Sequence, residues 1–414
     1  MEEDAKCYLF RASNIVYSMF LGLDDTDSPD GMCTTYLGAL IAEALEEQGC
    51  VIKNMRLIRL NPNVPWKTRG NASICIEFEG SAEIASQTAE RFISDYAMFD
   101  CQNTNPGYVV CETKPAPDFY CKALRGFCTV EEATAVLDGI GAVYKGYKNC
   151  RGLIGALAAV SAELSDKTYE YLAYRKPEAF GTPRIYDADS FRISAEETFP
   201  HCFDTWDFAA GKAVCIPHGK DPVLYGIRGE SPEWVKTAVS YLRAEETDRF
   251  VIWETNQATD AHILPGNDGF EEGRSYMFDG VVTAAPKTQR GGHVSFFVGD
   301  TACYAFEPTK SFRNTVRKLI EGDVLTVFGS FQNGGIHVEK FCLREAAKKE
   351  VRVSPKCPVC GGRMTSAGKG KGYKCRECSG RVREVACCPR DISEGWYEVP
   401  PDARRHLSKP VCRI

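Results

Sequence analysis

Apolar residues recur along the first 165 residues with two alternating periods. Short apolar runs predict β-strands at 19–23, 56–60 and 73–78. Apolar residues spaced three or four apart predict helices at 35–47, 82–96, 130–138 and 153–164. Strands that alternate with helices in this way are typical of an α/β or α+β domain.

The pattern changes twice after residue 165. A predicted helix at 234–242 lies among strand-like runs at 169–174, 222–227 and 250–254, as in a small ferredoxin-like sheet. Five short strands with Gly-rich turns follow between residues 275 and 343, with a helix predicted at 309–320 after the third strand. This arrangement predicts an OB-fold β-barrel. The chain is therefore predicted to be an α+β multidomain protein.

Length and cysteine content support several domains in a reducing compartment. A chain of 414 residues is too long for one hydrophobic core. No apolar run reaches the roughly 18 residues that span a bilayer, and the acidic start at residues 2–4 has the wrong charge for a signal peptide. The 20 cysteines are scattered, which predicts free thiols. We therefore expect a cytoplasmic protein with no membrane partner.

The charge distribution indicates a polyanionic partner at one end of the chain. The net charge is −6, but Lys and Arg outnumber Asp and Glu from residue 344 to residue 414. An acidic body with a basic end suits a protein that binds nucleic acid there. A solvated basic tail is the alternative that charge alone leaves open.

The strongest metal signal is a pair of Cys-X-X-Cys motifs separated by fourteen residues. The four cysteines are Cys357, Cys360, Cys375 and Cys378. Each motif places two sulfurs on one side of a turn, and two such turns complete a tetrahedral thiolate site for zinc. Because the protein fills all four positions, the predicted zinc is structural rather than catalytic. Four unrelated core thiols are the alternative.

The strongest catalytic signal follows the first predicted strand. Asp24, Asp25 and Asp27 lie within four residues, and carboxylates so close repel one another unless a cation lies among them. Mg²⁺ bound together with nucleotide phosphates is the usual solution. An acidic surface turn is the alternative. Thr34 then opens the next predicted helix, whose N-terminus attracts phosphate, although Thr34 could equally be a plain helix N-cap.

A loop from residue 61 to residue 71 carries two prolines, one tryptophan and two cations. Such a loop could clamp a triphosphate or stack on a base, whereas a solvated loop is the alternative. The residues predicted to bind ATP phosphate are Lys67, Arg69, Gly70 and Asn71. The chain has no Walker A motif, so a nucleotide site here is not a P-loop.

Several long motifs give the chain a family resemblance from about Met19 to its end. The motifs are GLDDTDSPDGMCTTYL, RLIRLNPNVPWKTRGN, RGLIGALAA, YLAYR with GTPR, PVLYGIRGE and TNQATDAH, followed by the OB segment and the ribbon. In content and order they are similar to the archaeal tRNA-Ile agmatidine synthetase family. Residues 1–18 precede the resemblance, and we expect that they are not part of the folded enzyme.

The resemblance implies a particular reaction and domain order. The enzymes of this family convert the wobble cytidine of a CAU-anticodon isoleucine tRNA to agmatidine, using ATP and agmatine. It implies that Thr34 is autophosphorylated, that the cytidine C2 oxygen is phosphorylated, and that agmatine then displaces phosphate. The implied parts are a kinase-like catalytic domain (19–165), a ferredoxin-like domain (166–270), an OB-fold (275–345), a zinc ribbon (353–382) and a basic C-terminal tail (383–414).

Two other functions compete with this one. A non-catalytic single-stranded nucleic-acid binding protein would need only the OB-fold and the ribbon, and it would turn over no ATP. An ATP-dependent amine ligase acting on a small molecule would not need the basic C-terminal region. ATP turnover and tRNA modification together separate the three.

Overall fold

The computed structural model describes residues 18–68, 70–348, 354–382 and 390–414. Of the residues singled out above, Arg69 lies outside the described part, as do the N-terminal 17 residues. The chain divides into two compact units. Unit 1 comprises the chain up to Ile263 together with Arg404–Ile414, and unit 2 is Leu264–Ala403.

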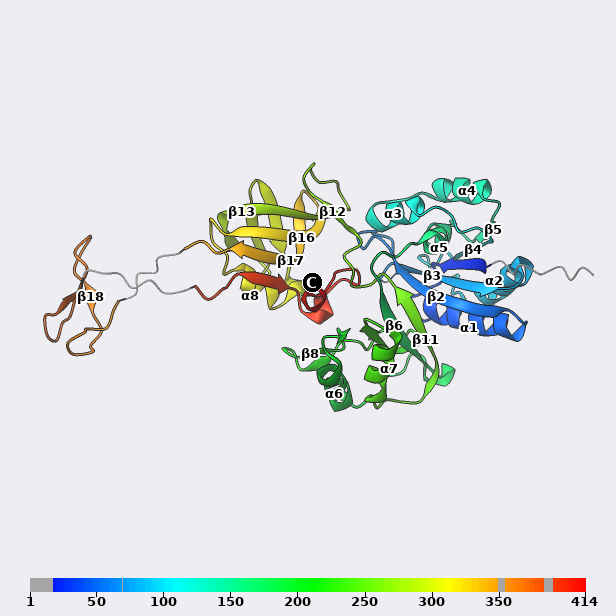
Figure 1. The fold of residues 1–414 in the computed structure, drawn as a ribbon, viewed down its shortest axis with the longest axis horizontal. Coiled ribbons are helices and arrows are strands. Elements are labelled where there is room, and N and C mark those ends of the chain that lie inside the picture. The colour runs from blue at the N-terminus through cyan, green and yellow to red at the C-terminus, as the bar shows by residue number, and fades with distance from the viewer. Residues whose placement is uncertain (1–17, 69, 349–353, 383–389) are drawn as a thin grey trace, which may run out of the picture. The chain divides into compact units, whose positions relative to one another are not determined.

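A nine-stranded sheet organises the described part of unit 1 (Figure 1), with strand order β5-β4-β1-β3-β2-β11-β6-β10-β7. The strands of its first half are β1 (Ser18–Asp24), β2 (Val51–Arg59), β3 (Ala72–Glu79), β4 (Gly107–Cys111) and β5 (Val143–Gly146). Those of its second half are β6 (Thr168–Arg175), β7 (Cys202–Phe203), β10 (Val223–Gly229) and β11 (Thr247–Thr255). A separate short ribbon pairs β8 (Trp206–Asp207) with β9 (Lys212–Ala213).

Alternating residues of β1 face two different hydrophobic cores, because successive strand residues point to opposite faces. Leu21 and Leu23 pack in one core with α1 (Thr34–Glu47) and α2 (Ala82–Tyr96). Phe20 packs in the other with α3 (Asp118–Arg125), α4 (Val130–Gly139) and α5 (Gly152–Ser161). The predicted helices are confirmed, whereas α3 was not predicted.

Helix α5 lies unusually close to β1. A Cβ built on Gly22 would lie 2.3 Å from the carbonyl oxygen of Ala156, so only glycine fits at this crossing. Gly152 meets Gly107 of β4 in the same manner, with a built Cβ 2.3 Å from the Gly107 nitrogen. These contacts bring the start of α5 against the end of β1, where the acidic loop begins.

The predicted kinase-like and ferredoxin-like regions share one sheet. β11 pairs in parallel with β2 through Glu254 opposite Arg56, and these two side chains form an ion pair of 3.0 Å. α6 (Ala188–Thr198) and α7 (Pro232–Ser240) pack on the second half of the sheet. The domain limits given above therefore remain a prediction, since no gap in the sheet separates the two regions.

Unit 2 contains a closed barrel, as predicted. Its strands are β13 (Ser275–Thr288), β14 (Val294–Val298), β15 (Thr301–Ala305), β16 (Val324–Gln332) and β17 (Gly335–Glu345), with β12 (Ile263–Pro265) and β21 (Gly395–Glu398) at its edges. β13 pairs with both β14 and β16, which closes the ring. The helix predicted at 309–320 is wrong in extent: a 3₁₀ turn, Glu307–Thr309, precedes a short α8 (Phe312–Val316). Lys310, with φ of 49°, separates the two because a left-handed residue cannot continue a helix.

The basic C-terminal region contributes to both units: the ribbon belongs to unit 2, and the last eleven residues belong to unit 1. The short strands β18 (Thr365–Ser366), β19 (Tyr373–Lys374) and β20 (Arg381–Val382) form the ribbon sheet, and residues 404–414 belong to unit 1. There Arg404 pairs with Asp204, and Lys409 pairs with Asp166 at 2.6 Å. The ribbon's cations Lys369, Lys371, Lys374, Arg376 and Arg381 are exposed. No helix of the described residues is both long enough and apolar enough to cross a bilayer.

Candidate active site and zinc site

The acidic loop is held in place by the loop that precedes β4. At its start Asp25 has φ of 57°, which turns the chain sharply away from β1. Asn105 donates its backbone N–H to the Asp25 carbonyl at 3.2 Å, and the Thr104 hydroxyl donates to the Asp27 carbonyl at 2.6 Å. These two hydrogen bonds fix the backbone of the acidic loop, and with it the positions from which the Asp25 and Asp27 side chains extend.

Asp27 is directed at Thr34. The Thr34 hydroxyl donates to Asp27 Oδ1 at 2.9 Å, and the Thr34 backbone N–H donates to the same oxygen. A second hydroxyl, that of Thr26, donates to Thr34 Oγ1 at 2.9 Å. A hydroxyl that donates to a carboxylate is the arrangement in which a base activates an oxygen nucleophile.

The N-cap alternative for Thr34 is wrong. Helix α1 begins with Thr34 as its first helical residue, and Cys33 occupies the N-cap position without a side-chain cap bond. The carboxylate of Asp27, seven residues earlier, accepts the free Thr34 N–H instead. The Thr34 hydroxyl is therefore not committed to its own helix.

Asp25 makes an ion pair that sequence reasoning missed. Arg151, at the N-cap of α5, donates from Nε and Nη2 to Asp25 Oδ2 at 3.1 and 3.0 Å. Burial raises the pKa of Asp25 to about 6, although the Arg151 charge opposes the rise. Arg151 also reaches the carbonyl of Asn103, so this side chain links the acidic loop to its supporting loop.

Asp24 lies against helix α5 at Gly155. A Cβ built on Gly155 would lie 1.8 Å from Asp24 Oδ2, so the helix leaves room for the carboxylate only because residue 155 has no side chain. Burial, followed by the charge of Asp25, raises the pKa of Asp24 well above its usual value. Two neighbouring carboxyl groups are therefore held where their charged forms are disfavoured.

The three carboxylates fit a site at which the protein supplies only some of the ligands of a divalent cation and a bound ligand supplies others. They do not form a site in which protein atoms surround the cation completely. Among the residues described, only the four ribbon cysteines bring three or more ligand atoms within 4.8 Å of one another. The raised pKa values of Asp24 and Asp25 are those of charged groups that a cation would stabilise. Mg²⁺ usually takes one or two carboxylates and completes its shell with water and phosphate.

This arrangement predicts that Asp24→Asn stabilises the fold. A carboxyl whose pKa is raised in the native state makes the free energy of unfolding fall as pH rises above about 4, because the unfolded chain loses its proton first. We expect the variant to have a higher Tm than the parent at pH 8, by roughly 2–4 °C per kcal/mol gained, and a smaller advantage at pH 4. Calorimetry at both pH values tests this, and an equal or lower Tm at pH 8 would contradict it.

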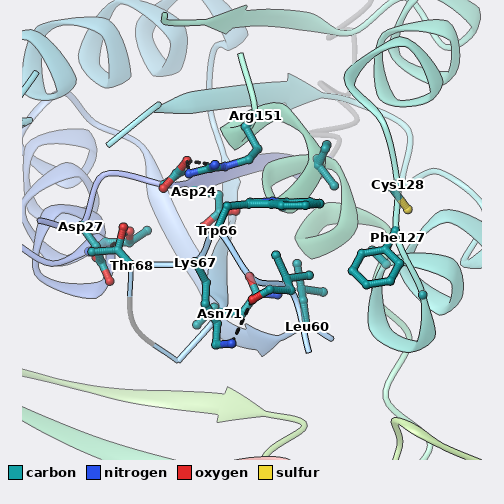
Figure 2. Close-up of a pocket in the computed structure, with 18 residues that line it drawn as sticks. Asp24, Asp27, Leu60, Trp66, Lys67, Thr68, Asn71, Phe127, Cys128 and Arg151 are labelled. Carbon is teal, nitrogen blue, oxygen red and sulfur yellow. Dashed lines mark hydrogen bonds and ion pairs between the residues drawn. The ribbon is translucent and has the colours of Figure 1, made fainter. Parts of the chain in front are cut away.

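The three aspartates and Thr34 line a cavity (Figure 2). Residues of the loop from residue 61 to residue 71 line the same cavity. Lys67 donates from Nζ to the carbonyls of Pro62 and Val64, at 2.8 and 2.9 Å, and Asn71 donates to the Asn61 carbonyl at 2.8 Å. Burial, followed by the charge of Arg405, lowers the pKa of Lys67. Lys67 and Asn71 thus line the cavity with the three aspartates and Thr34 while bracing their own loop.

Gly70 does not line the cavity that the sequence analysis predicted for it, and two aromatic side chains complete the lining of that cavity. Gly70 lines a second cavity rather than the first, and the two cavities share Asp27 and Thr34. Trp66 and Phe127 lie on the side of the first cavity away from Asp27, with ring centroids 6.0 Å apart (Figure 2). Phe127 follows the unpredicted helix α3, and no sequence signal pointed to it.

The four predicted zinc ligands converge in the ribbon. Cys357 Sγ lies 3.3 Å from Cys378 Sγ, and Cys360 Sγ lies 3.5 Å from Cys375 Sγ. Both turns close in the same way, because Cys357 and Cys375 each donate a backbone N–H to the residue five positions later, at 2.8 Å. This pairing of equivalent turns is what a tetrahedral zinc site with four cysteine ligands requires.

We expect Cys375→Ser to remove the zinc. Structural zinc contributes folding energy directly, so residues 354–382 of the variant should also become sensitive to protease. Zinc should fall from one ion per chain to near zero in metal analysis, whereas Cys121→Ser, at a free cysteine outside the ribbon, should retain it. Equal zinc contents in the Cys375→Ser variant and the parent would refute the site.

The fold and these two sites define a class of protein. A hydroxyl that donates to one of several clustered carboxylates is an arrangement suited to phosphoryl transfer. An OB barrel and a four-cysteine ribbon on the same chain are modules that commonly bind nucleic acid. Together they favour the class of enzymes that act on nucleic acid.

Comparison with known proteins identifies the family. Residues 20–87 match the TiaS TCKD domain, residues 150–262 the TiaS FLD domain, and residues 354–392 the TiaS C-terminal zinc ribbon domain. Over 410 residues, 98% of this chain and 99% of the relative, the chain is 58% identical to the isoleucine-tRNA 2-agmatinylcytidine synthetase TiaS of Methanocorpusculum labreanum. The chain belongs to the TiaS family.

Solved structures agree with this assignment. A complex of TiaS with isoleucine tRNA and ATP matches with a TM-score of 0.85 and 42% identity, covering 96% of this chain and 98% of that one. A complex of TiaS with isoleucine tRNA, AMPCPP and agmatine matches with a TM-score of 0.84 and 40% identity, with the same coverage. The resemblance in the sequence motifs is thereby confirmed.

Proposed function

We propose that this protein is an ATP-dependent 2-agmatinylcytidine synthetase acting on isoleucine tRNA with a CAU anticodon, which replaces the C2 oxygen of the wobble cytidine with agmatine. The observation that carries the proposal is identity of 58% across nearly the whole of a TiaS relative. Relatives with 42% and 40% identity have been crystallised with isoleucine tRNA and ATP, and with isoleucine tRNA, AMPCPP and agmatine. No disulfide joins the cysteines that the structure describes, which fits a cytoplasmic enzyme.

We assign the first chemical step to Thr34. The Thr34 hydroxyl passes its proton to Asp27 Oδ1, with which it is hydrogen-bonded at 2.9 Å, and the oxygen attacks a phosphorus of ATP. The bond from that phosphorus to its bridging oxygen breaks, and the electron pair leaves with the nucleotide. Asp24, Asp25 and Asp27 are the residues that would hold Mg²⁺, which neutralises phosphate charge when bound.

The amine transfer requires activation of the cytidine. An oxygen bonded to C2 is a poor leaving group, and a phosphoryl group on it makes it a good one. The C2 oxygen attacks the phosphorus carried by Thr34, the bond from that phosphorus to Thr34 Oγ1 breaks, and Oγ1 takes back the proton held by Asp27. The primary amine of agmatine then adds at C2, and the C2–O bond breaks with release of phosphate. Arg151 and Lys67 lie in the cavity where phosphate charge would develop, and Arg69, outside the described residues, follows Lys67 closely in the chain.

Nucleoside analysis tests the function. We expect CAU-anticodon isoleucine tRNA incubated with the protein, ATP and agmatine to yield 2-agmatinylcytidine in mass spectrometry of its nucleosides. Omission of ATP or of agmatine, or use of a tRNA with another anticodon, should yield none. ATP-independent tRNA binding without product would favour a nucleic-acid binding protein, and amine ligation without tRNA would favour a small-molecule ligase.

A further inference from the structure

Residues 404–414, which follow unit 2 in the chain, contact the loop from residue 61 to residue 71 of unit 1, called the phosphate loop below. Arg405 donates from Nη1 to Asn63 Oδ1 at 2.7 Å, across 342 residues of sequence. Leu407, two residues on, is buried in the same hydrophobic cluster as Leu60, at the start of the loop. Between them, His406 lies against Gly70, at the other end of the loop. Three consecutive residues therefore contact both ends of the loop.

The contact between His406 and Gly70 is tight. A Cβ built on Gly70 would lie 2.9 Å from both Cδ2 and Nε2 of His406, so only glycine leaves space for the ring. Gly70 was predicted as a phosphate contact, but its lack of a side chain is required here by the histidine. The phosphate loop and the C-terminal segment are shaped to fit one another.

The orientation of the His406 ring is fixed by Arg228. Arg228 Nη2 lies 2.9 Å from His406 Nδ1, and a guanidinium can only donate, so Nδ1 accepts and the ring proton is on Nε2. Burial, followed by the charges of Arg59 and Arg228, lowers the pKa of His406 well below its usual value, which keeps the ring neutral. The ring therefore has one tautomer and one orientation.

Buried ion pairs connect this histidine to the loop from the other side. Arg228 Nε pairs with Glu170 at 3.0 Å, and Arg59 Nη2 lies 3.7 Å from the same carboxylate. Arg59 in turn donates from Nη1 to the Gly70 carbonyl at 3.1 Å. The main chain at Gly70 is thus held between His406 and Arg59, and both are anchored on β6 and β10.

We propose that Arg405 and His406 are positioning residues of the reaction: they hold the loop 61–71 so that its cavity-facing residues meet the phosphates of ATP. The inference rests on the proposed function, because it takes the cavity lined by that loop as the ATP site. Neither residue contacts ATP in this account. Their effect passes through Asn63 and Gly70, and it should appear in ATP affinity before it appears in the amine step.

A double-mutant cycle between Arg405 and Asn63 tests the inference. We expect Arg405→Ala and Asn63→Ala each to raise the Kd for ATP, measured by calorimetry on the full chain, by about tenfold, because each loses the same contact. The double variant should be no weaker than either single variant. Arg405→Lys, which keeps a donor, should recover most of the affinity, and the KM for agmatine should stay within about twofold of the parent in all of them.

Lys409→Met is the matched control. Lys409 lies on the same segment and makes an ion pair with Asp166, away from the loop, so its variant should bind ATP like the parent. His406→Ala should weaken ATP binding as Arg405→Ala does, with the zinc content unchanged. Unaltered ATP affinity in Arg405→Ala and His406→Ala, or strictly additive effects in the cycle, would overturn the inference. Failure of the parent itself to bind ATP would instead refute the proposed function.

Discussion

Thr34→Ala should abolish phosphorylation of the protein and lower the rate of 2-agmatinylcytidine formation by about 10³-fold or more, as expected for loss of a nucleophile. The variant removes the hydroxyl that donates to Asp27 Oδ1 at 2.9 Å. The fold should survive, because Asp27 still accepts the backbone N–H at residue 34 and only hydroxyl contacts worth about 1 kcal/mol are lost. Labelled ATP followed by phosphopeptide mapping measures the first effect, and nucleoside analysis measures the second.

Two further variants make this result specific. Thr34→Ser keeps a hydroxyl at the same position and should retain part of both activities. Thr35→Ala removes the adjacent hydroxyl, whose nearest partner is Cys33 Sγ at 3.0 Å, and should still incorporate label. If Thr34→Ala remains labelled at another residue, the hydroxyl serves only the local hydrogen-bond network and the phosphoryl acceptor must be sought elsewhere.

Gly155→Ala should lower kcat/KM by about 10²-fold, although it adds a single methyl group. The three atoms nearest to the new Cβ all belong to Asp24, the closest at 1.8 Å, so the carboxylate must move. A displacement of about 1 Å in a catalytic group costs on this order. Alanine favours a helix interior over glycine by about 1 kcal/mol, so the Tm should not fall in parallel with the activity.

Gly139→Ala provides the matched control for this variant. Gly139 lies at the end of α4, and nothing lies within 4 Å of a Cβ built there. Activity of this variant should equal that of the parent. Full activity in Gly155→Ala would mean that the Asp24 carboxylate can move without consequence, and its assignment to the site would have to be withdrawn.

The spacing of apolar residues along the chain predicted those elements that bury one face and expose the other. Helix α2 buries one face, through Ala85, Thr88, Ala89 and Ile93, so its apolar residues recur at helical spacing. The helix predicted at 309–320 shows the limit, because the left-handed Lys310 interrupts it and no residue pattern marks that conformation. The pairing of β2 with β11 was equally inaccessible, since contacts between strands so far apart in the sequence depend on tertiary packing.

The candidate site was predicted where its residues are close in sequence, and missed where they are not. Asp24, Asp25, Asp27 and Thr34 lie in one short stretch, and their clustering was visible. Arg151 lies 126 residues from its partner Asp25, and an isolated arginine carries no signal of its own. A signal for Gly155 did exist, because a glycine inside a predicted helix costs about 1 kcal/mol and usually marks a close approach.

The division of unit 1 into two stretches has a consequence for the order of synthesis. Residues 404–414 complete this unit, but the ribosome reaches them only after all of unit 2. At about 5–20 residues per second the delay is roughly seven to thirty seconds, during which the nascent catalytic unit lacks Arg405 and His406. Until its own OB barrel and ribbon have been made, a nascent chain should therefore bind ATP about tenfold more weakly than the complete protein. Full affinity for ATP is in this way reached only by molecules that already carry the OB barrel and the ribbon.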